Sequence, residues 1–544
     1  MQSKNIGFWE AYSIGVGGMI GGGIFAVLGL TVLLAKGAAP LAFLFAGLLA
    51  LITAYSYAKL SVRFPSEGGT IEFVVRGFGS GLFAAWLNTL LLASYIIMLS
   101  LYSYAFGSYG AVLIAGVETL WLKKLLTAGV IIFFTILNLL GAYIVGKAED
   151  LMVAFKVLIL LFFSILGFFT IEPSRLSPET YPHVLNILTG GLIIFLAYEG
   201  FELIANTAQD VSDPEKVLPK AFYAAVASVI CIYVLVAIVA VGNLDPAEVV
   251  KAKDYVLAEA AKPFLGKLGF VLISIAALAS TASAINATLY GTARVSYLVA
   301  KYGELPQFFA RRIWKGAYEG AIIISALTVV AALSFDLKNI SVAGSLGFLL
   351  VFSAVNFANF RLYRQTKANR FLAALGGIGC LISAVVLVVH NFKTSPHALY
   401  SSAWVLGGAL IFELCYRLIS KRRLKDFIDW RLREREEFLE GVDRYMNLIL
   451  AAVKKHFKEA EVYLLDEIAE GYRESANKLH LLLALPEPLP KEEEPKIEEL
   501  IRVTAGLSPH HPLKISTVAS HELREYLREK SHKLLTDGME KNKS

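Results

Sequence analysis

Three ionisable side chains lie inside long apolar stretches of this sequence. Lys156 stands in LMVAFKVLILLFF (151–163), and Glu199 and Glu202 stand in LTGGLIIFLAYEGFELIANTAQD (188–210). A charged group at the depth of a lipid bilayer is costly, so each is expected to face the interior of a helix bundle. A buried amine or carboxyl group can bind and release a proton, which the apolar side chains around it cannot do. For Lys156 the alternative is a side chain that extends along its helix to the membrane surface.

A run of glycines interrupts the first apolar stretch. The segment from Gly15 to Phe25 reads GVGGMIGGGIF and contains six glycines. Each glycine in a helix interior costs up to about 1 kcal/mol relative to alanine, so the helix is expected to break here. Within a membrane, a break is tolerated only where the freed N–H and C=O groups are buried in protein or line a polar cavity. The alternative is that these glycines only permit close helix packing, which Gly17 and Gly21 would suit.

The composition requires elements that cross a membrane. Of the 544 residues, 56% are hydrophobic and 18% are charged, which is typical of a polytopic membrane protein. Apolar windows of about 20 residues predict twelve transmembrane helices. They are placed near residues 10–34, 40–62, 82–114, 124–145, 150–171, 187–208, 220–242, 268–300, 320–335, 340–361, 371–390 and 400–419.

The distribution of lysine and arginine predicts the orientation. With the N-terminus in the cytoplasm, the loops on that side hold about twice as many basic residues as the outer loops. The chain is therefore expected to be a multi-pass protein of the cell (plasma) membrane, embedded in the lipid bilayer with both termini cytoplasmic. The net charge of +6 follows from this asymmetry, so no nucleic-acid partner is expected.

The two unusual stretches stand five spans apart. Gly200 lies beside Glu199 and Glu202 in the sixth span, and the glycine run lies in the first. Interrupted helices at matching positions of two halves indicate a five-plus-five inverted repeat whose breaks meet near the middle of the membrane. The predicted fold class is an all-α polytopic membrane domain over residues 1–420, with twelve helices of which 1 and 6 are broken.

Four motifs in order along the chain carry a family resemblance. They are GGMIGGGIF (17–25), SVRFPSEGGT (61–70), AYEGFE (197–202) with the loop DVSDPEKVLPKA that follows it closely, and SAINATLYGTARVSYLVAKYGELP (283–306). Over residues 6–420 the sequence resembles the amino acid/polyamine/organocation (APC) superfamily of secondary transporters, in particular its proton-coupled amino acid transporter branch. The resemblance implies the leucine-transporter-like fold, alternating access, and uptake of amino acids or related amines.

A broken helix can bind an amino acid through its backbone. The N–H groups at the start of the second half-helix would bind the substrate carboxylate, and carbonyl groups near the breaks would accept hydrogen bonds from its ammonium. The residues expected to form this site are Met19, Ile20, Gly21, Gly22, Gly23, Ile24, Phe195, Leu196, Ala197, Tyr198 and Glu199. Phe195 and Tyr198 are candidate gates over it. The lack of an acidic cluster favours a neutral amino acid, and Glu199 and Glu202 keep a cationic substrate open.

The same resemblance assigns proton coupling to Lys156. In the proton-coupled branch, a lysine at this point of the fifth span occupies the place of the sodium ion in sodium-coupled relatives. The implied partners are the backbone near Gly21 and Gly22 and the hydroxyl groups of Ser283, Ser280 and Thr281. Sodium coupling is the alternative mechanism, and Glu199 or Glu202 would carry the proton if Lys156 does not.

Residues 421–544 are rich in charge and read as a separate domain. The apolar runs 461–466, 478–486 and 513–520, with amphipathic helices around them and a closing helix, predict a small cytoplasmic α/β accessory domain. The spacing distantly resembles the nucleotidyltransferase fold.

That fold needs metal-binding carboxylates which this sequence lacks. Asp466 and Glu467 stand where the fold has Gly-Ser, and Lys478, Leu479 and His480 stand where it has Asp-x-Asp. An inactive domain that binds a cytoplasmic regulator is therefore expected.

The predicted function is import of amino acids by proton-coupled alternating access. The alternatives are a sodium-coupled or exchange-type amino acid or polyamine transporter, and a sensor that binds amino acids without transporting them. An enzyme is not expected, since no nucleophile–base pair or metal cluster stands among the spans, and no cofactor is expected. Four asparagines are expected to form hydrogen bonds between helices, namely Asn138, Asn286, Asn356 and Asn359.

Overall fold

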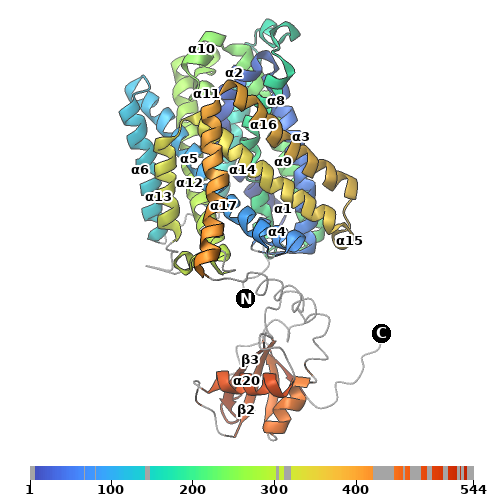
Figure 1. Cartoon of the computed structure of the whole chain (residues 1–544). Helices are drawn as coiled ribbons and strands as arrows, with labels where there is room; N and C mark the ends of the chain where they lie inside the picture. Colours follow the sequence, from blue (N-terminus) through green and yellow to red (C-terminus); the bar gives the residue numbers. More distant parts are fainter. Residues whose placement is uncertain are drawn as a thin grey trace. The chain divides into compact units, whose positions relative to one another are not determined.

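The computed structural model of the chain divides into two compact units, Met1–Arg423 and Leu424–Ser544, each described by itself (Figure 1). The residues that the structure describes are 6–66, 68–79, 81–140, 147–301, 305–310, 320–420, 446, 448–457, 460–465, 479–486, 490, 493–505, 513–523, 527 and 532–535.

The first unit is mostly helical over its described residues. Its helices are α1 (Phe8–Met19), α2 (Gly23–Ala35), α3 (Ala39–Arg63), α4 (Thr70–Phe78), α5 (Leu82–Ala115), α6 (Leu120–Leu139), α7 (Lys147–Phe168), α8 (Val184–Ile194), α9 (Pro214–Asn243), α10 (Pro246–Lys251), α11 (Val256–Glu259), α12 (Lys262–Lys301), α13 (Gly320–Ser334), α14 (Leu337–Arg361), α15 (Tyr363–Thr366), α16 (Arg370–Thr394) and α17 (Pro396–Ser420).

Nine helical stretches of the described residues are long and apolar enough to cross a membrane. The longest, Gly23–Arg63, joins α2 and α3 through a short 3-10 turn at Lys36–Ala38. Two shorter apolar helices, Met152–Phe168 and Gly320–Ser334, add to these nine. The unit is thus a polytopic helical membrane domain, and the count of twelve spans and the inverted repeat stay predictions.

Two of the apolar stretches are interrupted. The first break separates α1 from α2, where Ile20 leaves the helical conformation with φ −80° and ψ 57°. The second follows α8, where two 3-10 segments, Phe195–Tyr198 and Phe201–Thr207, are separated by extended Glu199 and by Gly200 at φ 118°. Because L side chains rarely adopt a positive φ, this second break requires a glycine.

The asparagines form the interhelical hydrogen bonds that the sequence predicts. The Asn138 amide on α6 donates to the Asn286 carbonyl oxygen on α12 at 3.1 Å. On α14, the amides of Asn356 and Asn359 donate to Thr53 and Ser56 of α3, both at 3.2 Å. These bonds connect helices far apart in sequence.

The second unit is built on a four-stranded sheet. Its strands are β1 (Glu461–Leu465), β2 (Leu479–Leu485), β3 (Leu513–Ala519) and β4 (His532–Leu535) in the order β3-β2-β1-β4. β1 is antiparallel to β2 and β4, and β2 is parallel to β3. The first three strands lie in the three apolar runs of the sequence.

β2 is the centre of this unit because both of its faces are buried. Leu481 and Leu483 pack in one apolar cluster with Ile501 of α20 (Glu494–Thr504). Leu482 on the opposite face packs in a second cluster with Val518. The alternation of side chains along one strand therefore supplies two small cores.

After β3, Leu523 and Leu527 are helical, and His532–Leu535 is a strand that the sequence did not predict. Tyr463 of β1 pairs with Leu534 of β4, so a partner about seventy residues earlier in the chain sets the conformation of this segment. Three of the positions compared with the nucleotidyltransferase motif, Asp466, Glu467 and Lys478, lie outside the described residues.

Candidate functional site

The two interruptions lie directly against each other. A Cβ atom built on Gly18 of α1 would lie 2.7 Å from the carbonyl oxygen of Gly200, and one on Gly200 would lie 2.6 Å from the backbone nitrogen of Met19. A Cβ on Gly23 would likewise lie 2.7 Å from the Cα of Ala197. Only glycine allows backbones to approach this closely, so Gly18, Gly23 and Gly200 are the glycines that bring the two breaks together.

Hydroxyl groups from two other helices bind buried carbonyl groups at the breaks. Tyr233 of α9 lies with its hydroxyl 2.7 Å from the Met19 carbonyl oxygen and 3.2 Å from that of Ala197. Ser280 of α12 lies 3.2 Å from the Ile20 carbonyl oxygen and 3.1 Å from that of Gly21. One tyrosine thus bridges the two interrupted stretches.

The start of α2 presents backbone donors. The first hydrogen bond of this helix runs from the Ala26 N–H to the Gly22 carbonyl at 2.9 Å. The N–H groups of Gly23 and Ile24 precede that bond, at the positive end of the helix dipole. Gly22 is covered by Tyr102 of α5, since a Cβ on Gly22 would lie 2.5 Å from the Tyr102 ring.

The two acidic side chains of the sixth stretch have different surroundings. Glu202 is fully buried, and its carboxyl group accepts hydrogen bonds from the Gly200 N–H at 2.8 Å and from the Tyr95 hydroxyl at 3.2 Å. It therefore fixes the conformation of the break. Glu199 is 4% exposed and lines a cavity.

That cavity has a volume of about 50 Å³ and lies among α1, α5, α12 and the sixth stretch. Its lining residues are Ile14, Gly17, Gly18, Tyr95, Tyr102, Glu199, Gly200, Leu203, Asn206, Ser283, Ala284, Ala287, Thr288, Gly291, Thr292 and Val295. The α12 members recur every three or four residues and so share one face. Since one water needs roughly 10–15 Å³, the cavity has room for a few waters but not for an amino acid.

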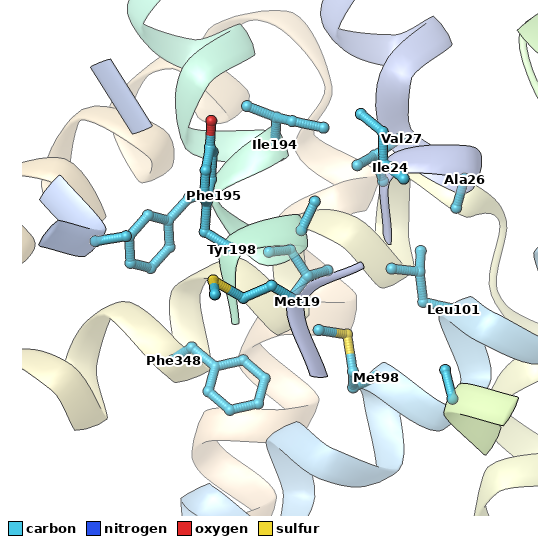
Figure 2. Packing of buried hydrophobic residues seen from close by; sticks show 14 of the residues in the cluster. Met19, Ile24, Ala26, Val27, Met98, Leu101, Ile194, Phe195, Tyr198 and Phe348 are labelled. Atoms are coloured by element: carbon cyan, nitrogen blue, oxygen red, sulfur yellow. The ribbon is translucent and has the colours of Figure 1, made fainter. Parts of the chain in front are cut away.

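Several predicted site residues surround the breaks without lining the cavity. Apolar side chains from α1, α2, α5, α14 and the sixth stretch gather there, with Met19, Phe195 and Ile24 among them (Figure 2). Phe195 is fully buried, with its ring centroid 6.0 Å from that of Phe352. The Tyr198 hydroxyl donates to the Phe43 carbonyl of α3 at 2.9 Å. Both aromatic rings are part of the packed core in this conformation.

The residues predicted for coupling lie on α7 and α12, two helices that contact α1. Lys156 is 2% exposed on α7, a helix that meets α1 where a Cβ on Gly17 would lie 2.6 Å from Val153. Val153 and Lys156 are three residues apart and so share one face of α7. Ser280 contacts the break and Ser283 lines the cavity, whereas the Thr281 hydroxyl donates to the Ala277 carbonyl of its own helix at 2.7 Å.

Tyr233 of α9, whose hydroxyl bridges the two breaks, is absent from the sequence prediction. Two tyrosines of α5 also belong to this region, since Tyr95 binds Glu202 and Tyr102 covers Gly22. Each of these tyrosines stands in an apolar helix, where an aromatic ring is commonly a packing residue. The only sign of a polar role in the sequence was therefore the hydroxyl group of the tyrosine.

The comparisons with known proteins agree with this architecture. The Amino acid permease family matches residues 6–413. "Uncharacterized protein MJ0609" of Methanocaldococcus jannaschii is 37% identical, over 78% of this chain and 97% of its own length. "Inner membrane transport protein YbaT" of Escherichia coli is 32% identical, over 77% of this chain and 97% of its own length. "Methylthioribose transporter" of Bacillus subtilis is 25% identical, over 76% of this chain and 94% of its own length.

The family match and the relatives named as transporters show that this helical membrane protein is a transporter and not an enzyme. The chain belongs to the amino acid permease family of the APC superfamily.

Proposed function

We propose that this protein imports amino acids by proton-coupled alternating access. The observation that supports this most is the contact between the two interrupted stretches at Gly18 and Gly200. Two breaks that meet inside a helix bundle bring backbone donors and acceptors together at one point, which is the requirement for binding a zwitterion.

The substrate would bind at these breaks. Its carboxylate would accept hydrogen bonds from the N–H groups of Gly22, Gly23 and Ile24 at the start of α2. Its ammonium would donate to carbonyl groups of the two stretches, two of which, those of Met19 and Ala197, lie within hydrogen-bond distance of Tyr233. A carbonyl oxygen has two lone pairs, so this contact leaves room for a second donor.

Glu199 and the face of α12 that lines the cavity would form the route by which the substrate leaves the site. The cavity extends from Glu199 and Ser283 along α12 to Val295 and is too small for an amino acid. We assign it to a conformation in which the substrate space is collapsed. Phe195 and Tyr198 would move when the site opens.

Lys156 would couple transport to protons. Its ammonium, buried on the face of α7 that meets α1, would take the place of a bound cation and exchange its proton once in each cycle. Ser280, Thr281 and Ser283 are the neighbouring hydroxyl groups proposed for this role. A sodium-coupled cycle is the second candidate, because the carbonyls of Ile20 and Gly21 beside the Ser280 hydroxyl are oxygen ligands of the kind that sodium binds.

We further propose twelve spans in a leucine-transporter-like inverted repeat, a plasma-membrane location and cytoplasmic termini. The unit from residue 424 onwards would bind a cytoplasmic regulator. A sensor that binds amino acids without moving them would use the same breaks and the same accessory unit.

Uptake by purified protein in liposomes tests the proposal. Labelled amino acids should accumulate when an inward proton gradient is imposed, and a collapsed gradient should abolish accumulation. A dependence on an inward sodium gradient alone would replace proton coupling by sodium coupling. Binding of amino acids without uptake of any amino acid or polyamine would replace the transporter by a sensor.

A further inference from the structure

A second hollow lies on the outer surface of the helical unit, between α3, α9 and α16. It has a volume of about 360 Å³ and is lined by Leu51, Ile52, Tyr55, Tyr223, Ala227 and Leu372. This volume falls in the range of about 300–1,000 Å³ that is typical of ligand sites. The lining is apolar apart from two tyrosine hydroxyl groups, so the hollow suits a hydrocarbon chain.

The two helices that form its walls are antiparallel in a known register. Gly47 of α3 touches Ile230 of α9, Tyr55 and Tyr223 line the hollow together, and the ring centroids of Tyr57 and Phe222 lie 6.4 Å apart. The residue number therefore rises along α3 as it falls along α9.

That register brings two lysines to the same end of the hollow. Lys59 lies four residues after Tyr55, and Lys220 lies three residues before Tyr223, so each shares a helix face with a lining tyrosine. α3 ends four residues beyond Lys59, and α9 begins six residues before Lys220. At 1.5 Å per residue, both lysines lie within about 10 Å of the helix ends, which is the depth of the lipid headgroups.

The third helix adds a cation at this end. Leu372 lines the hollow, and the Asn369 N–H just before α16 donates to the Tyr55 hydroxyl at 2.5 Å. Arg370 lies between Asn369 and Leu372 in the sequence, and its guanidinium carbon is 4.3 Å from the centre of the Phe360 ring. Among the described residues, Lys59, Lys220 and Arg370 have no acidic partner within ion-pair distance. The apolar hollow thus ends in unneutralised positive charge.

We propose that this hollow binds one anionic glycerophospholipid, with an acyl chain along Leu51, Ile52 and Leu372 and the phosphate at Lys59 and Lys220. The charge identifies the headgroup, because a zwitterionic lipid carries a cation that three basic side chains would repel. The Tyr55 hydroxyl accepts from Asn369 and keeps its own proton to donate to a phosphate oxygen.

Lipid retention measured by native mass spectrometry on the purified full chain tests this site. Phosphatidylglycerol should bind at one copy and more tightly than phosphatidylcholine with the same acyl chains. The double variant Lys59→Gln/Lys220→Gln should lose about fivefold in apparent affinity for each lysine removed. Lys251→Gln/Lys267→Gln, which changes two exposed lysines elsewhere, should keep the preference.

The hollow itself needs a separate variant. Ala227→Phe should fill it and reduce retention of both lipids, whereas Ala154→Phe, on an exposed position of α7, should not. Equal binding of the two lipids, or an unchanged preference in the double lysine variant, would overturn the proposal. So would full retention in Ala227→Phe, or binding of glycerol 3-phosphate as tight as that of the lipid.

Discussion

Gly18 and Gly200, in two helices that are both interrupted, touch through their backbones. A Cβ on Gly18 would lie 2.7 Å from the Gly200 carbonyl oxygen, and Gly200 has a φ of 118°. At each break some peptide groups are not part of a regular helix. The contact between Gly18 and Gly200 sets the distance between the peptide groups of the first break and those of the second. The geometry of the proposed substrate site therefore depends on two residues that have no side chain.

Replacing Gly18 with alanine should destabilise the protein and abolish uptake. The added methyl group must displace backbone, and such overpacking costs roughly 1–3 kcal/mol. The thermal unfolding midpoint and uptake in liposomes measure the two effects. Gly129→Ala on α6 is the control, since a Cβ there meets no atom within 4 Å. Equal thermal unfolding midpoints for Gly18→Ala and Gly129→Ala would contradict the close backbone contact between Gly18 and Gly200.

Tyr233→Phe should weaken substrate binding with little effect on folding. The change removes only the hydroxyl that bridges the Met19 and Ala197 carbonyls, which costs about 1 kcal/mol of stability. We expect an increase of several-fold in the KM of uptake. Tyr12→Phe is the control, because the Tyr12 hydroxyl donates to the Ser228 hydroxyl and not to a carbonyl of the breaks. The KM of uptake in Tyr12→Phe should equal that of the unaltered protein. A normal KM in Tyr233→Phe would show that the bridge does not orient the site.

Lys156→Ala should abolish accumulation driven by a proton gradient. The variant loses the only group that the proposal assigns to proton exchange, while the backbone site for the amino acid is unchanged. Substrate exchange at equal concentrations across the membrane should therefore persist. Lys124→Ala, an exposed lysine of α6, serves as the matched control. Accumulation that keeps its pH dependence in Lys156→Ala would transfer the role to Glu199 or Glu202.

A buried ion pair should stabilise the packing of the α10–α11 segment. Lys123 Nζ lies 2.8 Å from Asp254 Oδ2, and the Tyr104 hydroxyl donates to the same oxygen at 3.0 Å. Because both charges are buried, Lys123→Met alone should cost about 3–5 kcal/mol.

The double variant Lys123→Met/Asp254→Asn should recover part of that loss, since the buried charge of Asp254 is then removed as well. Glu118, the second carboxylate that pairs with Lys123, is partly exposed and can be solvated. A double-mutant cycle on unfolding measures the coupling free energy. Additive effects of the two single changes would show that the pair contributes no coupling.

A chain that ends at Arg423 should still transport. The relatives from Methanocaldococcus jannaschii and Escherichia coli match over 97% of their own lengths while covering 78% and 77% of this chain. They therefore have little that corresponds to the unit from Leu424 onwards. Uptake by the shortened chain in liposomes should have an unchanged KM, and a loss of uptake with normal folding would make this unit part of the transport cycle.

Much of the architecture was accessible from local sequence signals. Long apolar runs predicted membrane helices, the glycine run predicted the first break, and Gly200 beside Glu199 predicted the second. The three apolar runs of the second unit became β1, β2 and β3. The β4 strand was not predictable in this way, because HKLL is too short to show a period.

The sequence by itself determined where the backbone leaves regular structure and that the chain belongs in a membrane. These properties follow from residue hydrophobicity and from the missing Cβ of glycine, which act at the position of the residue itself. The tertiary structure decided which groups complete the breaks. Tyr233 is 214 residues from Met19, and Ser280 is 260 residues from Ile20. Such partners are selected by helix packing, which no local pattern records.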